Sequence, residues 1–223
     1  MKLAIYDFDG TYMKSQVLRL IFKFWKEQGL NMKKYKKVWR TIMWRYLLHK
    51  YNLFGWNKRS FRANAMALTV ELFKSVDRDI LDKFLNDLYI HLQEYVNQDM
   101  KKQLQKDKEE GFYTILLSGN FDIILAPFLN EGFDEVIGSE VLVNGELVSP
   151  SEVEIIIHDI KAVKIKEKFP EADYKNSKAY ADSDYDLPIL EIVGIPIVVN
   201  PDETLLNIAK ERHYKIFEKE KTI

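Results

Sequence analysis

The segment LAIYDFDGT, residues 3–11, decides the fold of this chain. Its first four residues form a short apolar run, and an acidic turn that contains glycine follows at once. This pattern predicts a buried β-strand that ends in a loop carrying two carboxylates, Asp7 and Asp9. Ligands of open parallel sheets bind beyond the carboxyl ends of the strands, so both acids are candidate site residues if the sheet is parallel.

Strand and helix patterns alternate in the second half of the chain. The predicted strands are 112–117 (FYTILL), 136–137, 178–181 (KAYA) and 195–199 (IPIVV). The predicted helices are 123–129, 159–169, which stops before Pro170, and 202–211, with Asp202 as its N-cap. Asn144 and Gly145 divide residues 141–148 into a hairpin. This alternation predicts an α/β fold, a Rossmann-like parallel sheet with helices on both faces.

A helical block interrupts this pattern directly after the first strand. Residues from about 15 to 110 contain almost no strand signal, and breaks fall near 29–31, 52–55 and 77. Two series have helical spacing, namely Trp39, Ile42, Met43, Tyr46, Leu47 and Leu81, Phe84, Leu85, Leu88, His91. We therefore expect residues 1–14 and 96–223 to form the core domain and residues 15–95 an inserted helical cap.

The composition limits the available chemistry. The 223 residues include no cysteine, which excludes disulfides, thiolate metal sites and cysteine nucleophiles. The chain has no apolar run long enough to span a bilayer. The first ten residues, MKLAIYDFDG, do not resemble a signal peptide, because acids follow a short apolar run almost at once. We therefore expect a cytoplasmic protein.

The charge is distributed unevenly. Residues 14–62 contain fourteen basic residues and one acid, a net charge of +13, so the remainder carries −14 within a total of −1. All four tryptophans, Trp25, Trp39, Trp44 and Trp56, lie in this basic block. They fill the core of the helical insert in one interpretation. In the other, some of them face an anionic ligand or a membrane surface.

Further polar residues lie after two of the later strands and in the helix between these strands. Ser118 follows the strand 112–117, and Asp182 and Asp186 follow the strand 178–181. Lys161 lies near the start of the helix between these two regions. If the strands are neighbours in one sheet, these groups converge with Asp7 and Asp9. Such a site offers a nucleophile, ligands for a cation and donors that compensate charge, which phosphoryl transfer requires.

These groups resemble the four motifs of the haloacid dehalogenase-like superfamily. DFDGT (7–11) is similar to the first motif, and LLSGN (116–120) to the second. Lys161 resembles the lysine of the third motif, and ADSDYDLPIL (181–190) resembles the fourth. The resemblance covers nearly the whole chain, and an insert between the first two motifs is typical of members with a helical cap. Residues 121–140, the hairpin and the lysine helix resemble the group that contains phosphoserine phosphatase.

The resemblance implies a mechanism with Mg²⁺ as cofactor. Asp7 would attack phosphorus and form an aspartyl-phosphate, and Asp9 would protonate the leaving oxygen and then activate water. The family's metal ligands would here be the Asp7 carboxylate, the Asp9 backbone carbonyl and Asp182. Asp186, four residues after Asp182, would lie in the outer metal position, with Asp184 as the less favoured candidate.

The resemblance also implies a set of phosphate-binding residues. They are Thr11, Ser118, Gly119 and Lys161, with Gly10 and Thr11 letting the loop approach the phosphate. Lys164 lies one turn beyond Lys161 and is the alternative lysine. We favour Lys161, because it leaves Ile165 and Phe169 on the core face of the helix.

Two positions depart from the family pattern. Tyr12 replaces a small or aliphatic residue, which suggests that it shapes the pocket. Gln16 stands where phosphoserine phosphatases carry a glutamate that holds the substrate amine, which weighs against phosphoserine. The four histidines, His49, His91, His158 and His213, show no metal-ligand spacing, and we expect ordinary surface or boundary residues.

The sequence therefore favours a phosphatase acting on a small phosphate monoester. One alternative is a lipid phosphatase, acting on a substrate such as phosphatidylglycerophosphate held by the basic cap. A phosphotransferase would use the same residues. A non-catalytic nucleic-acid-binding protein is the least favoured interpretation, because the sequence has no DNA- or RNA-recognition motif. The sequence does not indicate the oligomeric state.

Overall fold

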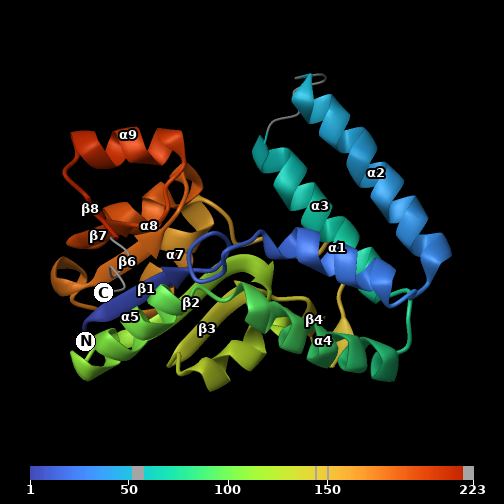
Figure 1. Ribbon diagram of the computed structural model, residues 1–223, viewed down its shortest axis with the longest axis horizontal. Helices are drawn as coiled ribbons and strands as arrows, with labels where there is room; N and C mark the ends of the chain where they lie inside the picture. The colour runs from blue at the N-terminus through green and yellow to red at the C-terminus, as the bar shows by residue number, and fades with distance from the viewer. Residues whose placement is uncertain (52–57, 144, 150, 218–223) are drawn as a thin grey trace.

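A single parallel sheet of six strands forms the centre of the described structure (Figure 1). The computed structural model describes residues 1–51, 58–143, 145–149 and 151–217, without the side chains of 58–60. The strands lie in the order β3-β2-β1-β6-β7-β8. Their bounds are β1 (Leu3–Asp7), β2 (Tyr113–Phe121), β3 (Glu135–Ser139), β6 (Lys178–Ala181), β7 (Ile195–Val198) and β8 (Lys215–Ile216). The predicted α/β fold is confirmed, with β1 between β2 and β6.

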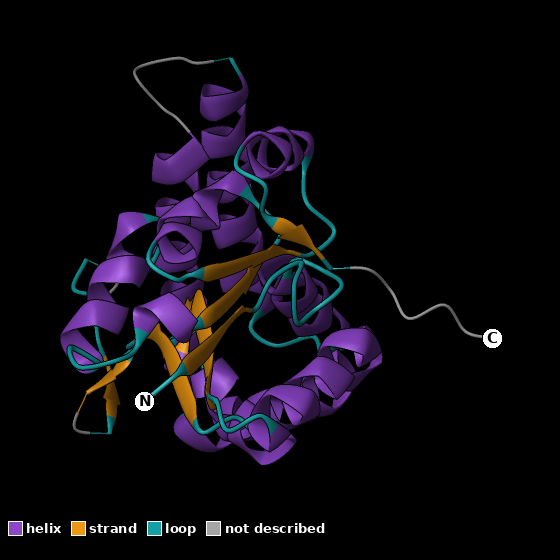
Figure 2. Cartoon of the chain, turned by 90° about the vertical axis from the view of Figure 1, so that its left-hand side faces the viewer, coloured by secondary structure: helices purple, strands orange, loops and turns teal. Residues whose placement is uncertain are grey.

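Apolar side chains cover both faces of the sheet. Successive side chains of β1 point to opposite faces, so this strand contributes to both. Leu3 and Ile5 belong to one buried cluster, and Ala4 and Tyr6 to the other. Helix α5 (Gln98–Glu109) packs into the cluster of Ala4 and Tyr6. The opposite face is covered by α7 (Asp159–Lys168), α8 (Leu187–Glu191) and α9 (Glu203–Glu211). Figure 2 shows helices on both sides of the strands.

Among the described residues, four α-helices lie between β1 and α5 in the chain. They are α1 (Val17–Glu27), α2 (Met32–Lys50), α3 (Lys58–Phe73) and α4 (Arg78–Leu92). Figure 1 shows α2 and α3 as a pair that projects away from the sheet. At the base of this segment, Phe73 meets Phe121 of β2, with ring centroids 5.6 Å apart, and Trp25 packs on Phe84 at 4.8 Å. The helical segment thus shares one apolar cluster with the sheet.

Most predicted boundaries agree with the structure. The breaks near 29–31 and 77 precede α2 and α4, whose N-caps are Asn31 and Asp77, whereas the break at 52–55 lies outside the described residues. The hairpin is formed by β4 (Leu142–Val143) and β5 (Glu146–Leu147), with Gly145 at φ +84°. Asn144, the other residue of the predicted turn, is not among the described residues. As predicted, Asp202 caps α9 by accepting a hydrogen bond from the Leu205 amide at 2.8 Å.

Several elements differ from the sequence prediction. The helix expected at 123–129 is α6 (Asp122–Leu125) followed by the 3₁₀ segment η3 (Ala126–Glu131), because Pro127 cannot continue the α-helical hydrogen bonds. Strand β8 was not predicted. Strand β2 continues past Leu117 to Phe121 with a shift in register. In the described part of the chain, the other 3₁₀ segments are η2 (Gln93–Tyr95), η4 (Tyr174–Asn176) and η5 (Asp184–Asp186).

A buried polar network braces the two strands that carry the candidate site. The Asp107 carboxylate on α5 accepts hydrogen bonds from Tyr6 at 2.5 Å and Tyr180 at 2.8 Å. It also forms an ion pair with Lys178 at 2.7 Å. Tyr6 precedes Asp7 on β1, and Tyr180 lies on the neighbouring β6. The network therefore ties both strands to one helix.

Replacing Asp107 should destabilise the fold strongly. Asp107→Ala leaves two buried hydroxyls without their shared acceptor and leaves Lys178 with Glu110 as its remaining partner. We therefore expect a loss of about 3–5 kcal/mol in the free energy of unfolding. Urea denaturation followed by circular dichroism measures this loss. The control is Asp82→Ala, which removes a half-exposed carboxylate that pairs with Arg78 on α4, and should cost less than about 1 kcal/mol. Equal losses in the two variants would contradict the account.

Candidate functional site

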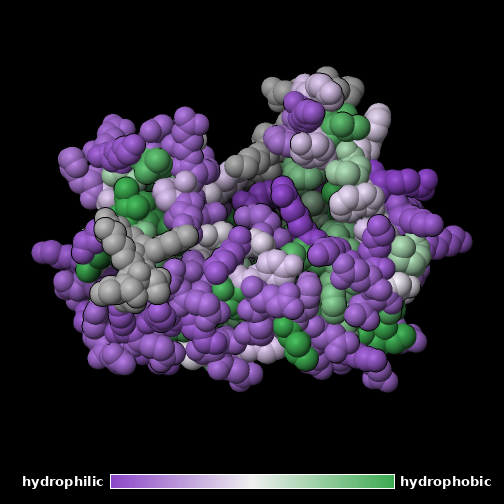
Figure 3. All heavy atoms as spheres, viewed as in Figure 1, coloured by the Kyte–Doolittle hydropathy of each residue, from purple (hydrophilic) through white to green (hydrophobic). Residues whose placement is uncertain are grey.

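The predicted site residues meet at the carboxyl edge of the sheet. Asp7 is the last residue of β1 and pairs in register with Leu117 of β2, so Ser118 lies beside it. On the other side, Asp182 directly follows β6. Together with Asp9 and Lys161, these residues line a cavity of about 410 Å³. Figure 3 shows a hollow in this face of the molecule, between the part that carries α9 and the α2–α3 pair.

A tight loop brings the first two acids together. The Tyr12 amide donates to the Asp7 carbonyl at 3.2 Å, and the Met13 amide to the Phe8 carbonyl at 2.8 Å. Gly10 adopts φ +87°, and a Cβ there would lie 1.9 Å from Asp182 Oδ2. Only glycine allows this close approach, so the loop can pack directly against the carboxylate that follows β6.

Hydrogen bonds fix the Asp9 carboxylate on both oxygens. The Val17 amide at the start of α1 donates to Oδ1 at 2.6 Å, and Asn120 Nδ2 donates to Oδ2 at 2.7 Å. Burial raises the pKa of Asp9, while the Val17 amide and the charge of Arg62 oppose this rise. A buried carboxyl group with a raised pKa suits proton donation and later proton acceptance.

Lys161 lies between two buried carboxylates. Its Nζ is 2.5 Å from Asp7 Oδ1 and 2.5 Å from Asp186 Oδ1. Burial alone would lower the pKa of Lys161, but Asp186 and Asp7 outweigh this effect and raise the pKa above its usual value. Lys164 instead pairs with Glu154 at 2.7 Å and lines a different cavity. Of the two lysines, only Lys161 reaches the acids of the site.

Three carboxylates form a group with the donor chemistry of a cation site. Oxygens of Asp7, Asp182 and Asp186 lie within 4.8 Å of one another. Burial and the charge of Asp186 raise the pKa of Asp7 well above its usual value. The same two causes raise the pKa of Asp182 to about 7. Buried carboxylate oxygens that repel one another fit a hard divalent cation such as Mg²⁺. Asp186 lies in the same group as Asp7 and Asp182, the two carboxylates expected to hold the metal.

Two residues near the loop do not reach the cavity. The predicted phosphate ligand Thr11 is fully buried, and its hydroxyl has no hydrogen-bond partner among the described residues. The expectation that Tyr12 shapes the pocket is wrong. Tyr12 is buried against Phe128 and Phe133, with ring centroids 6.2 and 4.9 Å away, so it belongs to the core beneath the loop.

Several lining residues were missed in the sequence. Asn120 lies in the irregular end of β2, next to the predicted Gly119, and Arg62 reaches the site from α3. His49 and His158 are half-buried boundary residues, as expected, but they also line the cavity, which the sequence did not indicate. His158 precedes α7 with φ +55°, an unusual conformation for a residue other than glycine. Only the position of Asn120 within the motif LLSGN could have indicated one of them.

Loss of the Asn120 amide should change how Asp9 titrates. Asn120→Ala removes a donor to the Asp9 carboxylate, so the pKa of Asp9 should rise further. We expect kcat to fall about 10–100-fold. The limb of the pH–rate profile that reports Asp9 should move to higher pH. Asn176→Ala, which removes an exposed amide paired with Asp173, is the control and should leave the profile unchanged. A lower kcat with an unmoved profile would contradict this assignment.

Comparison with known proteins identifies similar chains. The family model for haloacid dehalogenase-like hydrolases matches residues 4–191. A Streptomyces azureus protein, described as an inhibition of morphological differentiation protein, is 34% identical over 221 residues, covering 96% of this chain and 77% of that protein. A phosphoserine phosphatase of Mycobacterium tuberculosis is 36% identical over 59 residues. That match covers 26% of this chain and 18% of the longer mycobacterial protein.

Solved structures agree on the fold. A protein of unknown function from Bordetella pertussis has a TM-score of 0.80 at 17% identity, with 97% of this chain and 98% of that chain covered. A structure of phosphoserine phosphatase that represents an analogue of the phospho-aspartyl intermediate has a TM-score of 0.61 at 18% identity. Its match covers 98% of this chain and 93% of that chain. Among the described residues, no helix combines the length and the apolar character needed to cross a bilayer.

Proposed function

Because this chain belongs to the haloacid dehalogenase-like hydrolases, we propose that it hydrolyses phosphate monoesters with Asp7 as the nucleophile. The observation that carries this proposal is the pair of acids on one loop. Asp7 lies against Lys161, and Asp9 is fixed by two hydrogen-bond donors at the same end of the sheet. The two carboxylates therefore have different surroundings, which suits one for attack and the other for proton transfer.

The proposed reaction has two steps. In the first, an Asp7 carboxylate oxygen bonds to phosphorus, the ester P–O bond breaks, and Asp9 gives its proton to the leaving oxygen. In the second, Asp9 takes a proton from water, whose oxygen bonds to phosphorus and displaces the Asp7 carboxylate. The products are an alcohol and inorganic phosphate, and both acids return to their starting state. The raised pKa of Asp9 supports both of its proton transfers.

The remaining polar groups would hold the phosphoryl oxygens. Ser118 and Gly119 line the cavity beside Asp7, and Lys161 supplies a buried positive charge. These groups would offset the charge that gathers on phosphorus in the transition state. The fourth proposed ligand, Thr11, would act through the backbone of its loop, because its side chain is buried.

The carboxylate group fits a magnesium ion. Asp7, Asp182 and the Asp9 backbone carbonyl would hold it, with Asp186 beside them. When bound, the ion would compensate the negative charge of the phosphoryl group and of the acids. Lys161 alone leaves most of this acidic charge uncompensated, which supports a requirement for a cation.

We propose that residues 15–95 act as a cap that selects a small phosphorylated substrate. Core residues 1–14 and 96–223 would then carry the chemistry. Arg62 of α3 lies in the cavity, 3.5 Å from Gln16 Oε1, and its guanidinium carbon is 5.4 Å from the centre of the Tyr185 ring. A second anionic group on the substrate would find a partner in this guanidinium. On the sequence argument, the proposed location is the cytoplasm.

Arg62→Ala should separate two classes of substrate. For a monoester with a second anionic group, we expect KM to rise about tenfold or more, because a charge-assisted hydrogen bond is lost. For p-nitrophenyl phosphate, which has no such group, KM should change less than about threefold. Arg62→Lys keeps the charge and should fall between wild type and Arg62→Ala. An equal rise in KM for both substrates would contradict a role in recognising a second anion.

Phosphate release from about a hundred phosphorylated metabolites, with Mg²⁺ or with a chelator, tests the proposed function. We expect release from several monoesters with Mg²⁺ and none with the chelator. No release from any compound would contradict the proposal for small substrates. A phosphotransferase would show itself by transferring phosphate to added alcohols faster than to water. A lipid phosphatase would release phosphate only from lipid monoesters, which belong in the same panel.

A further inference from the structure

Helix α2 presents an apolar stripe to solvent in addition to its buried face. Its buried residues are Tyr35, Val38 and Ile42, at positions i, i+3 and i+7. The same spacing is repeated on the outer side by Trp44, Leu47 and Tyr51, the residue that caps the helix. Trp44 and Tyr51 are each 64% exposed and Leu47 is 43% exposed. Of the two interpretations of the tryptophans, an internal core holds for the buried Trp25, whereas Trp39 and Trp44 are 40% and 64% exposed. Trp56 lies outside the described residues.

Basic residues continue this stripe toward the start of the helix. Lys33, Lys36 and Arg40 have the same spacing, are exposed, and lead directly into Trp44. The sequence of α2 contains no acidic residue. Within the part of the chain that the structure describes, none of these three cations has an ion-pair partner. The outer face of α2 is therefore cationic along its first half and apolar along its second.

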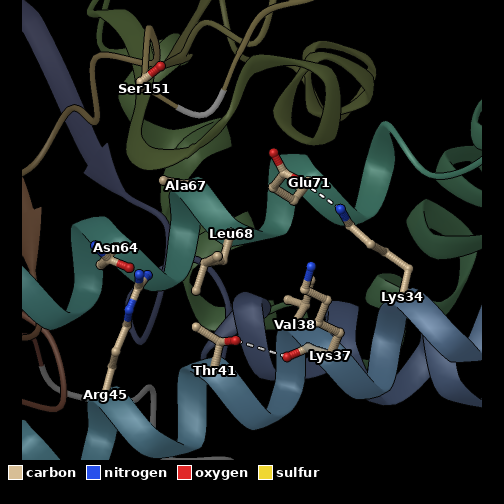
Figure 4. A pocket seen from close by; sticks show the side chains of 10 residues that line it. All are labelled: Lys34, Lys37, Val38, Thr41, Arg45, Asn64, Ala67, Leu68, Glu71 and Ser151. Atoms are coloured by element: carbon tan, nitrogen blue, oxygen red, sulfur yellow. Dashed lines mark hydrogen bonds and ion pairs between the residues drawn. The ribbon is translucent and has the colours of Figure 1, made fainter.

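The flank of α2 toward α3 is also cationic. A groove of about 450 Å³ lies on this flank, lined by Lys37, Thr41 and Arg45. In Figure 4, Thr41 lies between the two basic residues along α2, and the Arg45 side chain extends toward Asn64 of α3. Lys34 at its end pairs with Glu71 at 2.5 Å. The positive charge thus extends from the outer face into a groove that could accommodate an anionic head group.

We propose that the outer face of α2 docks on the surface of an anionic lipid bilayer. Basic residues next to aromatic and aliphatic residues on one helix face are typical of helices that lie in a membrane interface. Tryptophan and tyrosine favour the level of the head groups, and lysine and arginine pair with anionic lipids. Leu47 offers nothing to a nucleic-acid backbone, whereas a bilayer accepts it among its acyl chains.

The uneven distribution of charge along the chain supports an anionic bilayer as the partner of this face. Residues 14–62 carry +13 and the remainder −14, so an anionic surface attracts the α2 side and repels the opposite side. A second copy docked through the same face would bring two α2 helices without acids against each other, which is unfavourable. Tyr46 and His49 of the same helix line the candidate active site. Docking would therefore hold the site close to the bilayer.

Sedimentation with vesicles tests this proposal. The probes are vesicles of phosphatidylcholine alone and vesicles with one third phosphatidylglycerol, at about 50 mM and 500 mM salt. We expect the protein to bind the anionic vesicles at low salt, to release them at high salt, and to ignore phosphatidylcholine. Tryptophan fluorescence should shift to shorter wavelengths on binding, because Trp44 leaves water.

Matched variants separate the docking face from general surface charge. Lys36→Glu with Arg40→Glu should weaken binding at least about tenfold, and Trp44→Ala should weaken it severalfold and reduce the fluorescence shift. The controls are Lys83→Glu and Ile90→Ala, which change an exposed lysine and a 68% exposed apolar residue on α4. They should leave binding unchanged. Thermal melting checks that each variant is folded, independently of any enzymatic activity.

Three results would overturn the proposal. They are no binding to anionic vesicles at low salt, equal binding to both lipid compositions, and binding that survives the charge reversals on α2. Binding of single-stranded RNA or self-association in sedimentation velocity, without binding to vesicles, would assign the face to another partner and equally overturn it.

Discussion

Asp7→Asn should lower kcat for phosphate monoesters by about 10⁴-fold or more, because an amide oxygen does not attack phosphorus. Asparagine keeps the shape of the side chain and an acceptor for Lys161, so the substrate should still bind with a similar KM. The substitution also removes one of three mutually repelling carboxylates. The variant should therefore be at least as stable as wild type, and loss of activity cannot be explained by unfolding. Steady-state release of phosphate and thermal melting measure the two effects.

Asp184→Asn is the matched control for this experiment. Asp184 lies two residues after Asp182 in η5, yet it does not line the site cavity. Its replacement should leave kcat within about threefold of wild type. If Asp7→Asn retained more than about one percent of kcat, another group would have to be the nucleophile.

The metal-free protein should lose stability as the pH rises from 5 to 7.5. The pKa of Asp182 is raised to about 7 in the folded state by burial and by the charge of Asp186, against an ordinary value of 3.8. The folded state thus binds more protons than the unfolded state between these values, and its stability falls as the pH rises through the window. The expected loss is on the order of 3 kcal/mol, to which the raised pKa of Asp7 adds. Mg²⁺ should restore stability, most strongly at pH 7.5.

Asp182→Asn tests the assignment of this pH dependence. The variant should melt at a higher temperature than wild type at pH 7.5 without metal, and should gain less from Mg²⁺. Acids such as Glu131 and Asp134 have lowered pKa values and are ionised throughout the window, so they do not obscure the effect. Scanning calorimetry from pH 5 to 7.5, with and without Mg²⁺, gives the curves. Identical slopes in wild type and Asp182→Asn would exclude Asp182 as the source.

Local patterns were enough to predict the chemical centre of the site. A short apolar run before Asp7 and another before Asp182 each predict a buried strand, and parallel strands place their following residues at one edge. The distance from Lys161 to Asp7 confirms that the lysine helix opens toward this edge. The strand order brings Ser118 and Asp182 to either side of Asp7, because β1 lies between β2 and β6.

The substrate side of the site could not be predicted, because it depends on contacts between distant segments. Arg62 meets Gln16 across 46 residues, and Asn120 meets Asp9 across 111. The face of α2 that is buried was also ambiguous. The predicted apolar series from Trp39 to Leu47 has helical spacing, but of its members only Ile42 is buried, on the face that also carries Tyr35 and Val38. Periodicity identifies a helix and leaves its rotation to tertiary packing.

Trapping the intermediate on Asp7 tests the central claim most directly. The protein is mixed with a monoester that it hydrolyses, quenched in borohydride, and digested for mass spectrometry. An aspartyl-phosphate is an acyl phosphate, which borohydride reduces to the alcohol, so position 7 should appear as homoserine only in samples that contained substrate. The Asp7→Asn variant should show no such product. Active turnover with an unmodified Asp7, or with the reduced residue at another position, would contradict the account.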